Sequence, residues 1–171
     1  DMEGDTQNNN SFINSIDDNY EYDIQVALND NIYEYYGKVL GNNSTINLKD
    51  GDIVKSYYLM NNKYYILESD NYILTTKEDI YPYIDYRYLN IDNIREYIKM
   101  AVKDNGNYKV RVSDLVLDSQ SDKYIDININ EGDKTIIIDY TELLKITNSD
   151  IEKIVVTITY SNIDNIISLS E

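Results

Sequence analysis

Cysteine, histidine and tryptophan are absent from this chain of 171 residues, and proline and phenylalanine each occur once. Without cysteine no disulfide can form, and without cysteine and histidine there is no Ser-His or Cys-His nucleophile pair and no ordinary zinc site. Glycine occurs six times, and no GxGxxG or GxxxxGK phosphate-binding pattern is present. No run of about 18 apolar residues occurs, so the sequence predicts no membrane-spanning helix. We expect neither a cofactor nor a metal site.

Basic residues are also scarce, since 15 Lys and Arg stand against 31 Asp and Glu, giving a net charge of -16. Such a chain is repelled by nucleic-acid phosphates and anionic headgroups, so we expect no nucleic-acid partner. The same charge permits mimicry of DNA, in which carboxylates imitate phosphates. Residues 1–11 are polar and acidic and predict a flexible tether, followed by one β-rich domain over residues 12–171. Because the chain begins with Asp1 and Met2, we interpret its start as trimmed from a precursor or as a tag remnant.

The residues that are abundant favour β structure. The chain contains 26 Ile and 19 Tyr, and both residue types are strand formers. Residues 20–28 alternate apolar and polar side chains without a break, which is typical of a half-buried antiparallel strand. Short strands separated by Asn, Asp and Gly turns follow as far as residue 74, which predicts a meander. The 22 Asn residues and the Ile and Tyr content also fit a low-GC genome.

One long helix is expected in the middle of the chain. Ile91, Ile94 and Ile98 lie on one helical face, Asn90 is a suitable N-cap, and Asn105-Gly106 is a suitable stop, so the pattern predicts a helix over residues 91–104. Further strands are expected after it, including one at 153–160 and a last one at 164–170. The predicted fold class is α+β, mainly β: a curved antiparallel sheet with one main helix packed on it.

Tyrosines crowd into residues 57–88 and are the best candidates for a binding surface. Adjacent residues on a strand point to opposite faces, so Tyr57-Tyr58 and Tyr64-Tyr65 each place one ring in the core and one outside. Exposed tyrosine gives a large contact area at small entropy cost, although stacking between strands explains the same cluster without a function. The candidate partner-binding residues are Tyr57, Tyr58, Tyr64, Tyr65, Tyr72, Tyr83 and Tyr86. Long Ile- and Tyr-rich edge strands also favour pairing between two copies, so a homodimer is a second possibility.

Catalytic and metal-binding patterns are weak. The available general acids and bases are carboxylates, Lys and Tyr, and with 31 acids some carboxylate pair always looks suitable for glycoside cleavage. The stretch 126–132 has oxygen ligands, yet its Gly132 stands one place too late for an EF-hand loop and no Glu follows at the twelfth place. Alternation of Ile125, Ile127 and Ile129 predicts a strand there instead. We expect the protein not to be an enzyme.

The order of elements resembles that of the LolA/LolB-type lipoproteins. The similarity rests on a short N-terminal helix, the strand pattern Tyr-x-Tyr-Asp-Ile-x-Val at 20–26, the segment Asn-Asn-Lys-Tyr-Tyr-Ile at 61–66, and a helix across the sheet. It implies a half-open β-barrel whose concave face is covered by the helix, and a non-enzymatic, extracytoplasmic protein held to a membrane through a lipid anchor that this sequence lacks. Clostridial relatives of this kind act in spore germination and support a cell-wall amidase of the CwlD type, an N-acetylmuramoyl-L-alanine amidase acting on spore-cortex peptidoglycan.

Two function classes therefore remain open. The first is a Gram-positive lipoprotein that docks a protein partner through a tyrosine-bearing face or a strand edge. It suits the sequence better than lipid carriage, because tyrosine hydroxyls in an alkyl-chain cavity would each need a partner. The second is a cytosolic acidic inhibitor, an immunity protein or a DNA mimic.

Overall fold

The computed structural model describes residues 11–117 and 119–170, so the expected tether at 1–11 lies almost wholly outside the described residues. The described chain is mainly β, as predicted. Its strands are β1 (Asn19–Leu28), β2 (Asn31–Leu40), β3 (Asn43–Asp50), β4 (Ile53–Met60), β5 (Lys63–Glu68), β6 (Asn71–Thr75), β7 (Val102–Asp104), β8 (Asn107–Arg111), β9 (Tyr124–Asn130), β10 (Thr135–Asp139) and β11 (Ile154–Ser161). Its helices are η1 (Phe12–Ser15), α2 (Lys77–Ile80), η2 (Tyr86–Tyr88), α3 (Ile91–Met100), η3 (Val112–Asp114) and α4 (Thr141–Leu144).

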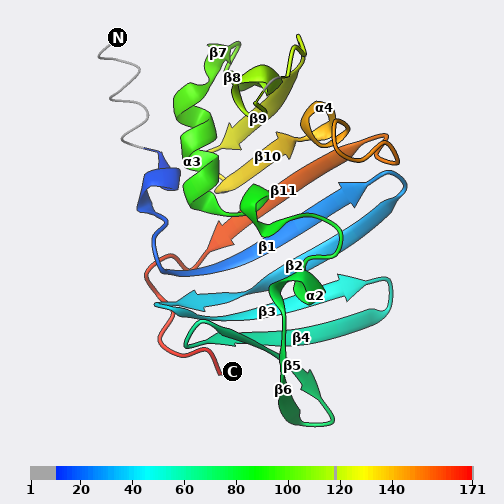
Figure 1. The fold of residues 1–171 in the computed structure, drawn as a ribbon. Helices are drawn as coiled ribbons and strands as arrows, with labels where there is room; N and C mark the ends of the chain where they lie inside the picture. The colour runs from blue at the N-terminus through cyan, green and yellow to red at the C-terminus, as the bar shows by residue number, and fades with distance from the viewer. Residues whose placement is uncertain (1–10, 118, 171) are drawn as a thin grey trace.

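All eleven strands form one antiparallel sheet that is not closed into a barrel. Their order is β6-β5-β4-β3-β2-β1-β11-β10-β9-β8-β7, and Figure 1 shows the sheet twisting strongly from one edge to the other. β1 and β11, from opposite ends of the described chain, pair at its centre over Glu21–Leu28 and Ile154–Ser161. On either side lies a meander of neighbouring strands, so β6 and β7 are the two free edges.

Turn residues explain why the strands follow one another so closely. Asn61 and Asn62 between β4 and β5, and Ser69 and Asp70 between β5 and β6, all have positive φ. Two consecutive residues of this kind make the tight turn whose twist matches that of a β-hairpin. Short polar residues such as Asn and Asp adopt this conformation at the lowest cost among non-glycine residues.

The two faces of the sheet differ because side chains alternate along each strand. One face, called the strap face, carries the core, with Ile24, Val26, Ile127 and Ile158 buried on it. It is covered by a segment of residues 76–90, the strap, which contains α2 and η2 and leads into α3 (Figure 1). The opposite face, called the open face, carries no helix of the described chain.

Buried hydrogen bonds hold the strap down. The hydroxyl of Tyr35 in β2 donates to the carbonyl oxygen of Ile80 at 2.8 Å, and that of Tyr140 donates to the carbonyl oxygen of Tyr88 at 2.6 Å. Ile80 itself is completely buried. Tyr35 and Tyr140 can therefore be buried in the core, because the hydroxyl of each has a hydrogen-bond partner in the strap.

Two expectations were wrong in detail. The long helix ends at Met100, and the residues after it turn into β7, because Asn105 and Gly106 both have positive φ and form a hairpin turn instead of a helix stop. Residues 164–170 do not form a strand. That segment is held by the side chain of Asn19, which accepts from the backbone N–H of Ile166 at 2.8 Å and donates to its carbonyl oxygen at 3.0 Å.

Polar contacts fix η1 to the rest of the domain. Ser11, the N-cap of η1, accepts a hydrogen bond from the N–H of Ile13 at 3.4 Å, and Glu131 accepts from the N–H of Phe12 at 3.0 Å. Arg95 of α3 donates to the carbonyl oxygens of Ile13 and Ile16. A guanidinium bonded to carbonyl oxygens makes strong, charge-assisted contacts, so the N-terminal turn is well anchored on α3.

Candidate functional site: an apolar sheet edge and a tyrosine-lined cavity

The edge strand β6 is the most exposed apolar element of the described chain. Its residues Tyr72, Ile73 and Leu74 are 58%, 46% and 64% exposed, and none of its five residues is charged. The opposite edge, β7, has three residues, of which Lys103 and Asp104 are charged. Natural sheets protect their edges with short strands and charges. β7 has both of these devices and β6 has neither.

The register shows which backbone groups of β6 are free. Glu68 pairs with Asn71 across the two-residue turn, which makes them a hydrogen-bonded pair, and such pairs alternate along the ladder. Asn71, Ile73 and Thr75 therefore bond to β5, whereas the N–H and C=O groups of Tyr72 and Leu74 point away from the sheet. These outward groups are the ones that an added strand would use.

Three of the predicted site tyrosines meet on the open face beside this edge. Tyr58 lies opposite Tyr65 across the β4–β5 pair, and the rings of Tyr58 and Tyr72 are 5.7 Å apart. Tyr65 lies opposite Leu74, and Tyr72 lies opposite Leu67. We call the surface formed by Tyr58, Tyr65, Leu67, Tyr72 and Leu74 the outer tyrosine patch.

The charge around this patch differs from that of the whole chain. Residues 53–75, which span β4 to β6, contain Lys55 and Lys63 against Glu68 and Asp70, so they are neutral. The chain as a whole carries a net charge of -16. An apolar, neutral surface on a strongly acidic protein is where a partner meets the least electrostatic and desolvation cost.

The other four predicted tyrosines lie on the strap face. Tyr57 is buried, so its prediction as part of a partner-binding surface is wrong, although the alternation predicted one buried ring in the Tyr57-Tyr58 pair. The ring of Tyr83 stacks on Tyr33 with 3.5 Å between centroids, and its hydroxyl donates to Asp50 at 2.7 Å. This hydrogen bond, followed by burial, raises the pKa of Tyr83 to about 12. Tyr64 and Tyr86 line a cavity, so the predicted set does not form one surface.

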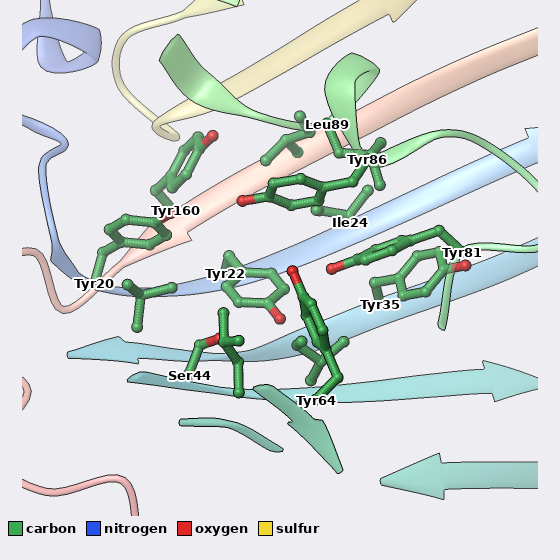
Figure 2. Close-up of a pocket in the computed structure, with 14 residues that line it drawn as sticks. Tyr20, Tyr22, Ile24, Tyr35, Ser44, Tyr64, Tyr81, Tyr86, Leu89 and Tyr160 are labelled. Carbon is green, nitrogen blue, oxygen red and sulfur yellow. The ribbon is translucent and has the colours of Figure 1, made fainter. Parts of the chain in front are cut away.

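The cavity lies between the strap and strands β1 to β5 and β11, as Figure 2 shows. Its volume is about 70 Å³. Seven tyrosines line it, namely Tyr20, Tyr22, Tyr35, Tyr64, Tyr81, Tyr86 and Tyr160. Five of them lay outside the predicted site, because they come from β1, β2, β11 and the strap. The only signal in the sequence was the placing of Tyr20 and Tyr22 on the buried face of the first strand.

A glycine makes room for one of these rings. A Cβ atom at Gly37 would lie 2.0 Å from the carbonyl oxygen of Thr45. That same oxygen accepts a hydrogen bond from the hydroxyl of Tyr22 at 3.0 Å. Gly37 stands directly opposite Tyr22 in the β1–β2 register, so the close approach of β2 and β3 at this point gives the buried phenol its partner.

The remaining cavity hydroxyls have no such partner. Within residues 11–117 and 119–170, the hydroxyls of Tyr20, Tyr64, Tyr81, Tyr86 and Tyr160 make no hydrogen bond to a side chain or to the backbone. Burial raises the pKa of each of these groups above its ordinary value. For Tyr81 the neighbouring phenols Tyr22 and Tyr86 raise it further. The cavity therefore stays uncharged at physiological pH, with several hydroxyls available to an occupant.

A pair of carboxyl groups lies on the open face of β1 and β2. Asp23 follows Tyr22, and Glu34 lies on the adjacent strand. Burial, then a hydrogen bond with Glu34 and the charge of Glu34, raise the pKa of Asp23 to about 7. No group of three acidic side chains suited to a metal ion occurs in the described part of the chain. The stretch 126–132 begins within β9, where Asp126 pairs with Lys109 at 3.6 Å, so its interpretation as a strand is confirmed.

The chain shows no significant similarity to a protein family, to a curated protein or to a solved structure. Among its described residues, no helix is long and apolar enough to cross a lipid bilayer.

Proposed function

We propose that this protein is a non-enzymatic binding protein that docks a protein partner through β6 and the outer tyrosine patch. The observation that carries the proposal is the uncharged, exposed edge strand, whose outward backbone groups lie beside an aromatic surface. An extended segment of a partner adds to such an edge through main-chain hydrogen bonds, and side-chain contacts supply the specificity. Tyrosine is among the residues that contribute most to binding energy at protein interfaces.

The chemistry of the partner follows from charge. The patch itself is neutral, but a net charge of -16 surrounds it, so association is fastest with a protein whose docking segment has a basic rim. A second copy would bring another -16 to the contact. We therefore rank a heterologous partner above the homodimer, which uses the same edge.

We further propose an extracytoplasmic, lipid-anchored protein with a half-open-barrel fold of the LolA/LolB type. Its role would be like that of the clostridial germination lipoprotein GerS, and its partner a CwlD-type amidase of the spore cortex. The sheet order and the covering strap are compatible with this fold. The strap-face cavity, at about 70 Å³, is too small for an acyl chain, since ligand pockets usually measure about 300–1,000 Å³.

Titration calorimetry with a purified CwlD-type amidase tests the docking edge. We expect Leu74→Pro to weaken binding more than tenfold, because proline removes an outward N–H without removing a bond to β5. Leu74→Ala keeps that N–H and should lose less. A pair of lysine variants supplies the matched control. Ile32 and Leu74 are both 64% exposed and only Leu74 lies in the patch, so Leu74→Lys should weaken binding more than Ile32→Lys does.

Three results would contradict the proposal. They are an amidase that does not bind, equal binding by Leu74→Pro and the wild type, and equal losses from the two lysine variants. If the protein instead inhibits a nuclease or a toxin, the second function class gains support. Sedimentation over a range of concentrations separates self-association from heterologous docking, and self-association through β6 should weaken at low salt because like charges repel.

A further inference from the structure

The cavity beneath the strap is walled by two rows of contacting aromatic rings. The first row consists of Tyr160, Tyr20 and Tyr22, with centroids 5.4 Å and 6.3 Å apart, and the second of Tyr35, Tyr81 and Tyr86, with 5.1 Å at each step. Tyr64 of β5 stands at one end between the rows (Figure 2). Neighbouring rings are tilted by 35° to 75°, and the hydroxyl groups of Tyr64, Tyr81 and Tyr86 point into the space (Figure 2).

The electrostatic character of this space favours a cation. Its lining contains no charged side chain, and its non-tyrosine members are Ser44 and aliphatic residues. The nearby Arg95 is occupied by backbone carbonyl oxygens and by Asp92. Aromatic faces and phenol oxygens both present negative partial charge, and the net charge of -16 raises the local concentration of cations and lowers that of anions.

The volume of the cavity limits the size of the ligand that it can bind. A volume of about 70 Å³ holds a group of a few heavy atoms, well below the usual ligand pocket. Metal cations such as Ca²⁺ and Mg²⁺ take carboxylate and carbonyl oxygens, and the carbonyl oxygens of Thr45 and Ile80 already accept from Tyr22 and Tyr35. A methylated ammonium group needs no such ligands, because aromatic faces bind it directly.

We propose that this cavity binds the methylated ammonium group of a small organic cation, held by the rings of Tyr22, Tyr81 and Tyr86. The ring of Tyr86 already makes a cation–π contact with a residue that does not line the cavity. Nζ of Lys77 lies over this ring, 4.9 Å from its centroid. Tyr64 is only half-buried, so the cavity is reached from the side of β5. This site is independent of the docking edge, and either proposal can fail without the other.

Tetramethylammonium and choline are the probes, and 3,3-dimethyl-1-butanol is the uncharged analogue of choline. Titrations followed by amide NMR shifts, at constant ionic strength, should show saturable binding of both cations and at least tenfold weaker binding of the alcohol. Tyr86→Leu should weaken choline binding at least tenfold, whereas Tyr86→Phe, which keeps the ring, should change it less than about threefold. Tyr124→Leu, on the open face of β9, is the control and should have no effect.

A substitution of Lys77 supplies a second test, in which choline binding should become tighter instead of weaker. Removing its charge in Lys77→Met should tighten choline binding about twofold to threefold, because one unfavourable cation is lost near the site, and should leave the alcohol unchanged. If Tyr86→Leu unfolds the protein, Tyr64→Leu at the half-exposed end replaces it. Absence of cation binding, equal binding of choline and its neutral analogue, or a Lys77→Met variant that binds choline no better would each overturn the proposal.

Discussion

The buried hydroxyl of Tyr57 gives the sharpest test of the energetics of this tyrosine-rich core. Tyr57 is 2% exposed, and its hydroxyl has no hydrogen-bond partner among the described residues. Burial, followed by the nearby charge of Asp79, raises its pKa to about 12, and the Asp79 carboxylate accepts a hydrogen bond from Thr75 at 3.0 Å. A buried polar group without a partner costs about 1–3 kcal/mol. Tyr57→Phe removes the group and keeps the ring, so we expect a gain of about 1–2 kcal/mol in the free energy of unfolding.

Urea unfolding followed by circular dichroism measures this gain, and thermal melts should show an increase of about 3–6 °C for a chain of this size. The matched control is Tyr35→Phe, because that hydroxyl is also buried but donates to Ile80 at 2.8 Å. Tyr35→Phe should lower the free energy of unfolding by about 1 kcal/mol. A loss of stability in Tyr57→Phe equal to that in Tyr35→Phe would refute the reasoning, since it would mean that the Tyr57 hydroxyl donates to Asp79 in solution.

Three further changes test other parts of the domain. The pKa of Asp23, about 7 in the folded protein, lies above the unfolded value, so the folded state keeps a proton that the unfolded chain releases and stability falls as pH rises from about 4 to 7. Asp23→Asn also removes the repulsion from Glu34. It should therefore stabilise the protein at pH 8 by about 1–2 kcal/mol, a value reduced for solvent screening, and should have little effect at pH 4. Equal effects on the free energy of unfolding at both pH values, measured by urea unfolding, would contradict this prediction. Gly37→Ala should cost at least about 3 kcal/mol, because its Cβ would collide with the Thr45 carbonyl oxygen, and a melting temperature within 2 °C or so of wild type would exclude the close contact. Arg95→Met should cost about 2–3 kcal/mol and increase hydrogen exchange in η1, and unchanged exchange there would show that the turn does not depend on the guanidinium.

Local patterns in the sequence were sufficient to predict most of the strands and turns. β11 spans Ile154–Ser161 against the predicted 153–160, and β1 begins one residue before the predicted alternation, because strands are specified by the local alternation of side chains. β7 was missed because Asn105-Gly106 suits both a helix end and a hairpin turn. Only the pairing of β7 with β8 decides between them, and this pairing is tertiary information.

The candidate site was predictable only in part for the same reason. The alternation correctly separated Tyr57 from Tyr58 and Tyr64 from Tyr65, since that rule is local. The cavity depends on Tyr20 and Tyr160, which are brought together by the β1–β11 pair from distant parts of the chain. No spacing along the sequence predicts such a contact.

The central β1–β11 pair has a consequence for how the domain assembles. Each meander can form from hairpins of neighbouring strands. The two meanders join only when β1 and β11, from opposite ends of the described chain, pair with each other. Closing so long a loop is the step with the greatest entropy cost. A chain still emerging from a ribosome therefore lacks the strand that completes the middle of the sheet, and the half-formed sheet exposes the inner edge of β1 until β11 has been synthesised.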